Sequence, residues 1–188
     1  MKKPILLLCC VFALQLLSAQ EQLMTNAFNR EATLLNGYWK YIVDPYENGF
    51  YNYRYEPFEN QENPGNGAFF TNAKRKDKAD LIEYDFDKMD SLKVPGDWNS
   101  QKENLFYYEG SIWYKKSFDY SKHDPENRVF VYFGASNYET DVYLNGAKLG
   151  KHIGGFTPFQ FEVTGLLQER ENFIIVKVDN KRKKEGVP

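Results

Sequence analysis

The chain has 188 residues, and its 24 Lys and Arg residues nearly balance its 26 Asp and Glu residues, giving a formal net charge of −2. This balance lacks the basic footprint of a nucleic-acid-binding protein, so we expect no nucleic-acid partner. Aromatic residues make up 17% of the chain and are mostly Tyr and Phe, which favours strands and sheet cores. Without a targeting segment, the length is that of one ordinary domain.

The first 19 residues have the pattern of a secretory signal peptide. Lys2 and Lys3 precede an apolar run over residues 5–17, and a small residue, Ala19, stands before Gln20. The apolar run is too short for a membrane-spanning helix. We therefore expect an exported protein, in the periplasm or outside the cell, without a membrane span.

Cys9 and Cys10 are the only cysteines, and both lie inside the predicted signal peptide. They come early in the apolar run without small residues before them, which favours simple cleavage over lipid attachment. The mature chain then has no cysteine for a disulfide or a thiolate metal site. His123 and His152 are too far apart in sequence to indicate a zinc site or a hydrolytic triad. We expect no metal and no other cofactor.

The order of elements predicts an N-terminal arm followed by one domain. Residues 20–33 are polar and weakly patterned, and the domain is expected over residues 34–188. Its first strand is predicted over residues 35–43, where a turn signal leads into aromatic and β-branched residues and an Asp-Pro pair follows. A long insert at about residues 45–90 contains at most one hairpin.

Within this insert, residues 50–56 alternate, which predicts a half-exposed strand with Tyr51, Tyr53 and Tyr55 on one face. These tyrosines have three possible roles: stacking on a polysaccharide, covering the sandwich, or docking on another domain. Cover or docking is the favoured interpretation.

The second half of the chain contains short strands at regular spacing. They are predicted over residues 112–118, 129–133, 140–144, 148–153, 159–163 and 173–178. Asn145-Gly146 is a strong hairpin signal between the third and fourth of these strands, and requires a positive φ at Gly146. Almost no helical period is present, apart from one short turn at residues 165–168. The pattern predicts an all-β protein with a jelly-roll β-sandwich.

Several segments resemble, in order and spacing, the sugar-binding domain of family-two glycoside hydrolases. They are residues 35–39 (LNGYW), 94–99 (VPGDWN), 108–114 (YEGSIWY), 133–138 (FGASNY), 142–146 (VYLNG), 150–159 (GKHIGGFTPF) and 176–180 (VKVDN). The resemblance covers the chain from about residue 35 to its end and implies a galactose-binding-domain-like jelly roll.

The family includes β-glucuronidases, β-galactosidases and β-mannosidases, and this chain is most similar to secreted bacterial members of the β-glucuronidase type. The resemblance implies that an immunoglobulin-like domain and a catalytic (β/α)₈ barrel follow. Gly154 stands near the position where the β-galactosidase branch carries an acidic sodium ligand, which is evidence against that branch and against a metal. Both catalytic glutamates of the family lie on the barrel, so no catalytic residue is nominated. The chain alone is expected to be inactive.

Three residues are candidates for sugar binding. Tyr108 and Glu109 belong to a signature loop, and His152 belongs to the GKHIGG segment. The alternative for Glu109 is a structural or solvated role, and for His152 a hydrogen bond to a neighbouring loop. Three tryptophans also invite a stacking role, but their apolar surroundings favour packing in the core. They are Trp39, Trp98 and Trp113.

We therefore expect the sugar-binding domain of a secreted family-two glycoside hydrolase that acts in polysaccharide degradation. Its partners would be a β-linked oligo- or polysaccharide, uronic-acid-containing chains among them, and the C-terminal domains of the same enzyme. Two alternatives stay open: a free-standing carbohydrate-binding or adhesion module, and a truncated product without function. Related domains continue past residues 176–180 with a further strand. We therefore expect the sandwich to be incomplete at its C-terminal end and prone to associate.

Overall fold

The computed structural model describes residues 24–80, 84–121 and 126–182. The predicted signal peptide lies outside these residues. Within the described ranges, no helix is long and apolar enough to cross a membrane.

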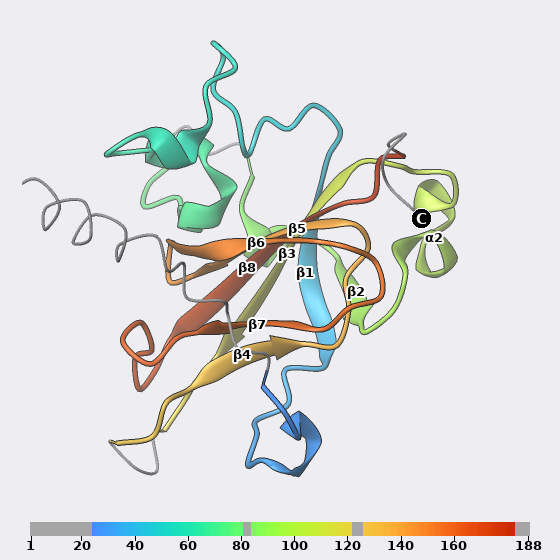
Figure 1. Ribbon diagram of the computed structural model, residues 1–188. Helices are drawn as coiled ribbons and strands as arrows, with labels where there is room; N and C mark the ends of the chain where they lie inside the picture. Colours follow the sequence, from blue (N-terminus) through green and yellow to red (C-terminus); the bar gives the residue numbers. More distant parts are fainter. Residues whose placement is uncertain (1–23, 81–83, 122–125, 183–188) are drawn as a thin grey trace, which may run out of the picture.

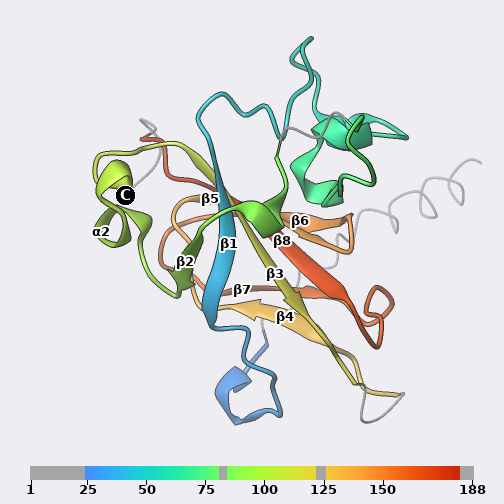
Figure 2. The same ribbon diagram turned by 180° about the vertical axis from the view of Figure 1, so that it is seen from behind.

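The described chain forms two antiparallel sheets that pack as a β-sandwich (Figures 1 and 2). The larger sheet has the strand order β2-β1-β3-β8-β5-β6, and the smaller sheet pairs β4 with β7. The strands are β1 (Gly37–Asp44), β2 (Ser91–Val94), β3 (Ser111–Phe118), β4 (Phe130–Phe133), β5 (Glu139–Leu144), β6 (Ala147–Ile153), β7 (Phe159–Glu162) and β8 (Asn172–Asp179). The all-β sandwich predicted from the sequence is confirmed.

In the described part of the chain, helical structure is limited to short segments. The α-helix α2 (Trp98–Gln101) begins after Asp97, whose carboxylate accepts a hydrogen bond from the Ser100 backbone N–H at 2.8 Å, a standard N-cap. The 3₁₀ segments are Ala27–Asn29, Phe58–Asn60, Gly65–Gly67, Phe69–Thr71, Phe86–Lys88 and Glu103–Leu105.

Seven of the strands predicted from the sequence are found within two residues of the expected bounds; the one predicted over residues 50–56 is not. A further strand, β2, was not predicted. It has only four residues, of which Leu92 alone is buried, so a period of two has too few repeats to be visible. Pairing with β1 over Gly37 to Lys40 makes it a strand.

The predicted hairpin joins β5 to β6. Asn145 and Gly146 have φ values of 52° and 85°, the left-handed conformations that a type I′ turn requires. The Asn145 side chain also accepts a hydrogen bond from the Phe173 backbone N–H at 2.9 Å and donates one to the Leu166 carbonyl at 2.8 Å. The turn is therefore tied to the neighbouring strand β8 as well as closed locally.

The first hydrophobic core lies between the two sheets. Alternate residues of the large sheet face the β4–β7 pair, and partly buried residues such as Leu149 complete the layer. Its buried members are Trp39, Leu92, Trp98, Leu105, Ile112, Tyr114, Val142, Leu144, Phe159, Phe161, Val163, Ile174, Val176 and Val178. This is the packing expected for a sandwich.

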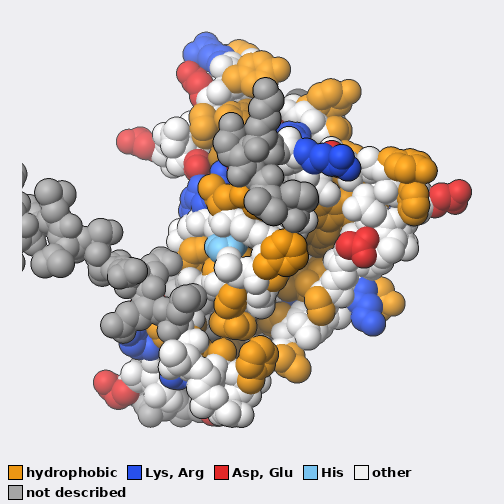
Figure 3. Space-filling view, turned by 45° about the vertical axis from the view of Figure 1, so that its right-hand side comes forward, with side chains coloured by type: hydrophobic (Ala, Val, Ile, Leu, Met, Phe, Trp, Pro, Cys, Tyr) orange, Lys and Arg blue, Asp and Glu red, His pale blue; other side chains and the backbone are white. Residues whose placement is uncertain are grey.

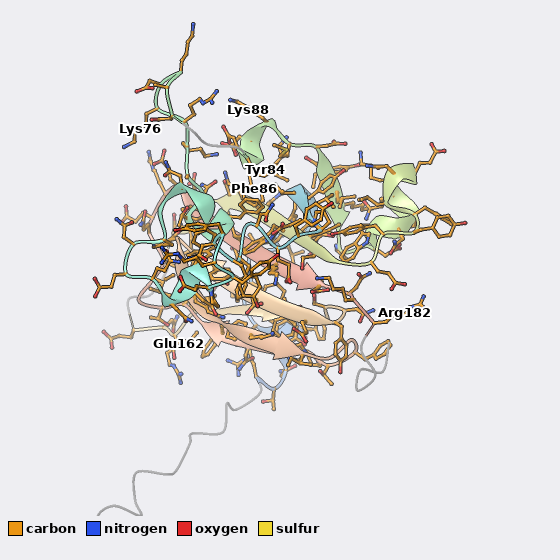
Figure 4. All side chains as sticks on the ribbon, turned by 90° about the horizontal axis from the view of Figure 1, so that it is seen from above. Lys76, Tyr84, Phe86, Lys88, Glu162 and Arg182 are labelled. Carbon is orange, nitrogen blue, oxygen red and sulfur yellow. The ribbon has the colours of Figure 1, made fainter. Side chains whose placement is uncertain are left out.

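A second core covers the opposite face of the large sheet, beneath the insert at residues 45–90 (Figure 1). Here the Phe70 ring stacks on Tyr143 of the sheet at a centroid distance of 4.6 Å, and Tyr143 stacks on Trp113 at 6.0 Å. Phe86 is a buried member of this core and Tyr84 packs against it, as Figure 4 shows from above. The insert is therefore a third layer that buries apolar surface. All three tryptophans are buried, as predicted, but Trp113 belongs to this second core.

The predicted strand over residues 50–56 is wrong. The segment forms a tight turn closed by an isolated bridge between Tyr51 and Pro57. The Asn52 side-chain oxygen accepts hydrogen bonds from the backbone N–H groups of Arg54 (2.8 Å) and Glu56 (3.0 Å). These local hydrogen bonds compete with strand pairing. The segment therefore forms a turn although its sequence alternates as a strand would.

The described part of the N-terminal arm contacts the domain, because the Met24 backbone N–H donates to the Gln160 side chain at 3.0 Å. The predicted boundaries of the arm and domain, and the predicted incompleteness of the sandwich, stay predictions.

Candidate functional site

One end of the large sheet carries a row of polar side chains where four strands begin or end. Asp44 ends β1, Ser111 begins β3, Asp179 ends β8 and Glu139 begins β5. The register pairs Asp44 with Ser111, Ser111 with Asp179, and Asp179 with Glu139. Paired residues point to the same face of a sheet, so these four side chains lie side by side on the face that the insert covers. We call them the polar row.

Asp44 anchors the loop that follows β1. Its carboxylate accepts hydrogen bonds from the Trp113 indole N–H (2.9 Å) and from the backbone N–H groups of Asn48 (2.8 Å) and Gly49 (3.0 Å). Burial raises the pKa of Asp44, and the bonds from Gly49, Trp113 and Asn48 oppose that rise. With its acceptor positions in use, Asp44 holds the loop in place.

Glu47 stands in this loop and pairs with two lysines of β8 and the segment after it. Its Oε1 lies 2.7 Å from the Lys177 Nζ and 3.3 Å from the Ser111 Oγ, and its Oε2 lies 3.5 Å from the Lys181 Nζ. Burial alone would raise the pKa of Glu47, but the hydrogen bond and charge of Lys177, with Lys181, hold it below its usual value. The Lys177 ammonium also lies 4.4 Å from the centre of the Phe50 ring.

Tyr108 is partly buried, and its hydroxyl points into the protein. The hydroxyl donates to the Ser111 carbonyl at 2.9 Å, while the Tyr108 carbonyl accepts from the Trp98 indole at 3.2 Å and the Asn99 amide at 3.1 Å. Burial raises the pKa of the Tyr108 hydroxyl to about 12. The negative charges of nearby carboxylates, Asp44 foremost, contribute to this rise. Its hydroxyl therefore stays protonated and fixes the loop before β3.

Glu109 is the accessible member of the same loop. Its carboxylate lies 2.9 Å from the Arg182 guanidinium; the Arg182 side chain is largely exposed and that of Glu109 is partly exposed. The two segments are also joined through the backbone, because Gly110 N–H donates to the Asn180 side chain at 2.8 Å and Asn180 N–H donates to the Gly110 carbonyl at 3.2 Å. Arg182 extends from the edge of the molecule in Figure 4.

His152 lies elsewhere on this end of the sandwich. It lies in β6, where it is paired with Thr140 of β5, and its ring stacks on Phe159 at a centroid distance of 4.1 Å. Its Nε2 is 3.2 Å from the Thr157 hydroxyl, and burial lowers its pKa. The contact between His152 and Thr157 agrees with the alternative role predicted for His152, a hydrogen bond to a neighbouring loop.

The structure therefore brings two of the three candidate residues together. Tyr108 and Glu109 share one loop, whereas His152 is on β6, separated from β3 by the strands β8 and β5. Two apolar residues that follow His152 in the chain, Ile153 and Phe156, are exposed. Hydrophobic side chains form patches between polar ones on the surface of the molecule (Figure 3).

The polar row and its lysines were missed by the sequence analysis. Lys177 interrupts an otherwise apolar strand, and a lysine in a buried strand needs a carboxylate partner. That was the available signal, but the partner, Glu47, is 130 residues away in the sequence. Sequence spacing alone does not identify such a pair.

The charged groups at this end of the sheet differ in how far they are already paired. Asp44 and Glu47 are held by N–H or ammonium donors, while the exposed Glu109–Arg182 pair offers both acceptors and donors to a hydroxyl-rich ligand. Among the residues that the structure describes, no group of three or more His, Cys, Asp or Glu side chains is arranged to hold a metal ion.

Comparison with known proteins identifies this domain. Residues 95–186 match the family model described as glycosyl hydrolase 2 galactose-binding domain-like. A β-glucuronidase of Formosa agariphila is 42% identical over 76 residues, which is 40% of this chain and 8% of that protein. A β-galactosidase of Thermoanaerobacter pseudethanolicus is 29% identical over 120 residues, which is 60% of this chain and 16% of that protein.

Among solved structures, the β-glucuronidase of Bifidobacterium dentium in complex with coumarin-3-O-glucuronide superimposes with a TM-score of 0.58 at 29% identity. The superposition covers 82% of this chain and 21% of that chain. This chain therefore corresponds to a small part of each of these relatives.

Fold and matched segment together define a galactose-binding-like β-sandwich domain. It is a glycoside hydrolase family 2 galactose-binding-like domain of the β-glucuronidase-like kind.

Proposed function

We propose that this chain is the sugar-binding domain of an exported β-glucuronidase-like enzyme that degrades β-linked polysaccharides. One observation carries the proposal: the segment matched to the family model, residues 95–186, contains Tyr108, Glu109 and His152. The similarity to a solved β-glucuronidase over 82% of this chain supports the same assignment.

In this proposal the Glu109–Arg182 pair meets the carbohydrate, because it is a charged pair that reaches the surface at this loop. A guanidinium binds a uronic-acid carboxylate through two parallel hydrogen bonds, which suits a glucuronic-acid-containing chain. Tyr108 positions this loop through its bond to the Ser111 carbonyl. His152 marks a separate contact on the same end of the sandwich.

The hydrolytic step would come from further domains of the same enzyme. Retaining hydrolysis needs two carboxyl groups about 5–5.5 Å apart on either side of the scissile bond. The buried acids of the polar row lie beneath the insert and serve its loops. We therefore expect the purified chain to leave p-nitrophenyl β-D-glucuronide intact, and reproducible hydrolysis, free of contaminating enzyme, would contradict this.

Sugar binding is tested by NMR titration of the full chain with a β-1,4-linked oligoglucuronate. We expect chemical-shift changes at the amides of residues 108–110 and 182, and their loss in the R182M variant. Lys88→Met serves as the matched control, because Lys88 is an exposed cation on the insert (Figure 4). Chemical-shift changes that are the same in the R182M variant as in the unchanged chain would place binding elsewhere.

Export is tested separately. The sequence of residues 1–19 supports cleavage before Gln20. Expression in a Gram-negative host, followed by fractionation and N-terminal sequencing, should yield a periplasmic or secreted product that begins at Gln20. A cytoplasmic product that retains Met1 would contradict the proposal.

A further inference from the structure

An open hollow of about 680 Å³ lies on the insert, beside the loop that follows β1. Four tyrosines and three residues with amide side chains line most of it: Tyr46, Tyr51, Tyr53, Tyr55, Asn48, Asn52 and Gln61. Phe58, which packs against the second core, completes the lining. We call this feature the tyrosine hollow.

The exposed tyrosines of the hollow contribute little to the fold. Tyr46, Tyr53 and Tyr55 are 79%, 85% and 82% exposed, whereas Tyr51 is half-buried against the Phe50 ring at 4.7 Å. Large aromatic side chains gathered at an exposed surface are typical of a binding site.

The backbone beneath these tyrosines is held in one conformation. Asn52 closes the turn through bonds to Arg54, Glu56 and the Tyr55 backbone. Tyr55 itself has a φ of 58°, a left-handed conformation that is costly for a bulky residue and that glycine adopts freely. Residues in such strained backbone conformations cluster at ligand sites, where the strain helps to hold a side chain in the position that binding requires. Arg54 packs on the Tyr53 ring at 5.3 Å and restricts it further.

Size and chemistry together define the ligand. The volume lies within the range of small-ligand sites, about 300–1,000 Å³, which suits a few sugar rings. The residues that line the hollow, all within the described range 24–80, are uncharged. A pyranose ring presents an apolar C–H face to an aromatic ring and a rim of hydroxyls to amides and phenols, and tyrosine supplies both kinds of contact at low entropic cost.

We propose that the tyrosine hollow is a second carbohydrate site that binds a neutral pyranose oligosaccharide. The site is distinct from the Glu109–Arg182 pair, which is charged and belongs to other loops. Carbohydrate as the ligand class rests on the proposed function; the position and the neutral character rest on the hollow itself. The site would hold an uncharged stretch of a polysaccharide while the Glu109 loop meets a uronic-acid unit.

Isothermal titration calorimetry of the full chain with cellohexaose, xylohexaose and mannohexaose tests the proposal. We expect binding of at least one of them, and a loss of at least about tenfold in affinity, equivalent to roughly 1.4 kcal/mol, in the Tyr53→Ala/Tyr55→Asn variant. Asparagine is chosen at position 55 because it tolerates the left-handed backbone. Tyr38→Ala is the matched control, since Tyr38 is 71% exposed and lies outside both the hollow and the Glu109 loop. The affinity of this variant for the sugars should equal that of the unchanged chain.

Unfolding midpoints of all variants show whether the fold is kept. Tyr46→Ala tests sugar binding in the hollow independently, because Tyr46 belongs to another loop. The proposal is overturned if none of the three sugars binds, if the double variant binds as tightly as the unchanged chain, or if only the oligoglucuronate binds. The charged probe with R182M reports on the Glu109 loop, and the neutral probes with the tyrosine variants report on the hollow. Failure of one proposal is therefore distinguishable from failure of the other.

Discussion

The indole N–H of Trp113, in the middle of the large sheet, donates a hydrogen bond to the Asp44 carboxylate across 2.9 Å, and both side chains are buried. The same carboxylate holds the backbone of Asn48 and Gly49. One acid thus connects the second core to the loop that carries Glu47 and borders the tyrosine hollow.

Asp44→Ala should lower the free energy of unfolding by about 2–4 kcal/mol, because three N–H donors, two of them in buried hydrogen bonds, lose their acceptor. Urea unfolding measures the change. Glu62→Ala, which removes an exposed carboxylate of the insert, is the control and should stay within about 0.5 kcal/mol. Equal effects of the two changes would show that the Asp44 bonds do not support the loop.

Glu47 should make stability depend on pH in the acid range. Because Lys177 and Lys181 hold its folded pKa below the ordinary value of 4.5, the unfolded chain takes up the proton first as pH falls. The stabilisation by Glu47 is thus fully present above about pH 4.5 and is lost as pH falls through the folded pKa. Asp44 has a raised pKa and acts in the opposite direction, but it is present in both proteins compared.

The measurement is the free energy of unfolding of the unchanged chain minus that of Glu47→Gln, followed from about pH 7 to about pH 3. The difference should be about 1–3 kcal/mol at neutral pH and should shrink below about pH 4.5. A difference that is constant across this range would contradict the prediction.

Lys115 and Asp87 should respond unequally to substitution. The Lys115 ammonium is buried and lies 2.6 Å from the Asp87 carboxylate, which is itself largely exposed and also pairs with Lys74. Burial lowers the pKa of Lys115. Asp87→Ala leaves a buried ammonium without this partner and should cost about 3 kcal/mol, whereas Lys115→Met should stay within about 1 kcal/mol.

The double variant Asp87→Ala/Lys115→Met provides the control in chemical denaturation. It should be more stable than Asp87→Ala alone, because no buried charge then remains at this position. A double variant less stable than either single variant would contradict this account.

Gly146→Ala should destabilise the β5–β6 hairpin by about 1–2 kcal/mol, the cost of a side chain in the left-handed region. A Cβ at Gly146 would meet open space, so the cost would come from backbone conformation alone. Gly165→Ala is the matched control, because its Cβ would also meet open space and its φ is not positive. Thermal unfolding should separate the two variants, and coincident curves would contradict the turn assignment.

Much of the β-sandwich was predictable because its signals are local. Short apolar runs, separated by turn residues at regular spacing, mark β3, β5 and β8, and Asn145-Gly146 marks the hairpin through the conformations that these residues adopt readily. A period of two needs several repeats, so four-residue β2 remained hidden. The tyrosine segment misled because side-chain hydrogen bonds from Asn52 formed a turn within a strand-like pattern.

What the sequence by itself determined is the class of fold, the positions of most strands and the family resemblance, all carried by residues close together in the chain. Only the tertiary structure decided that the insert covers the second face of the sheet, that Glu47 meets Lys177, and that Tyr46 joins the turn of Tyr53 and Tyr55 around one hollow. These contacts depend on which strands pair and where their ends meet. Strand order and register follow from the burial of the whole chain, and no local pattern specifies them.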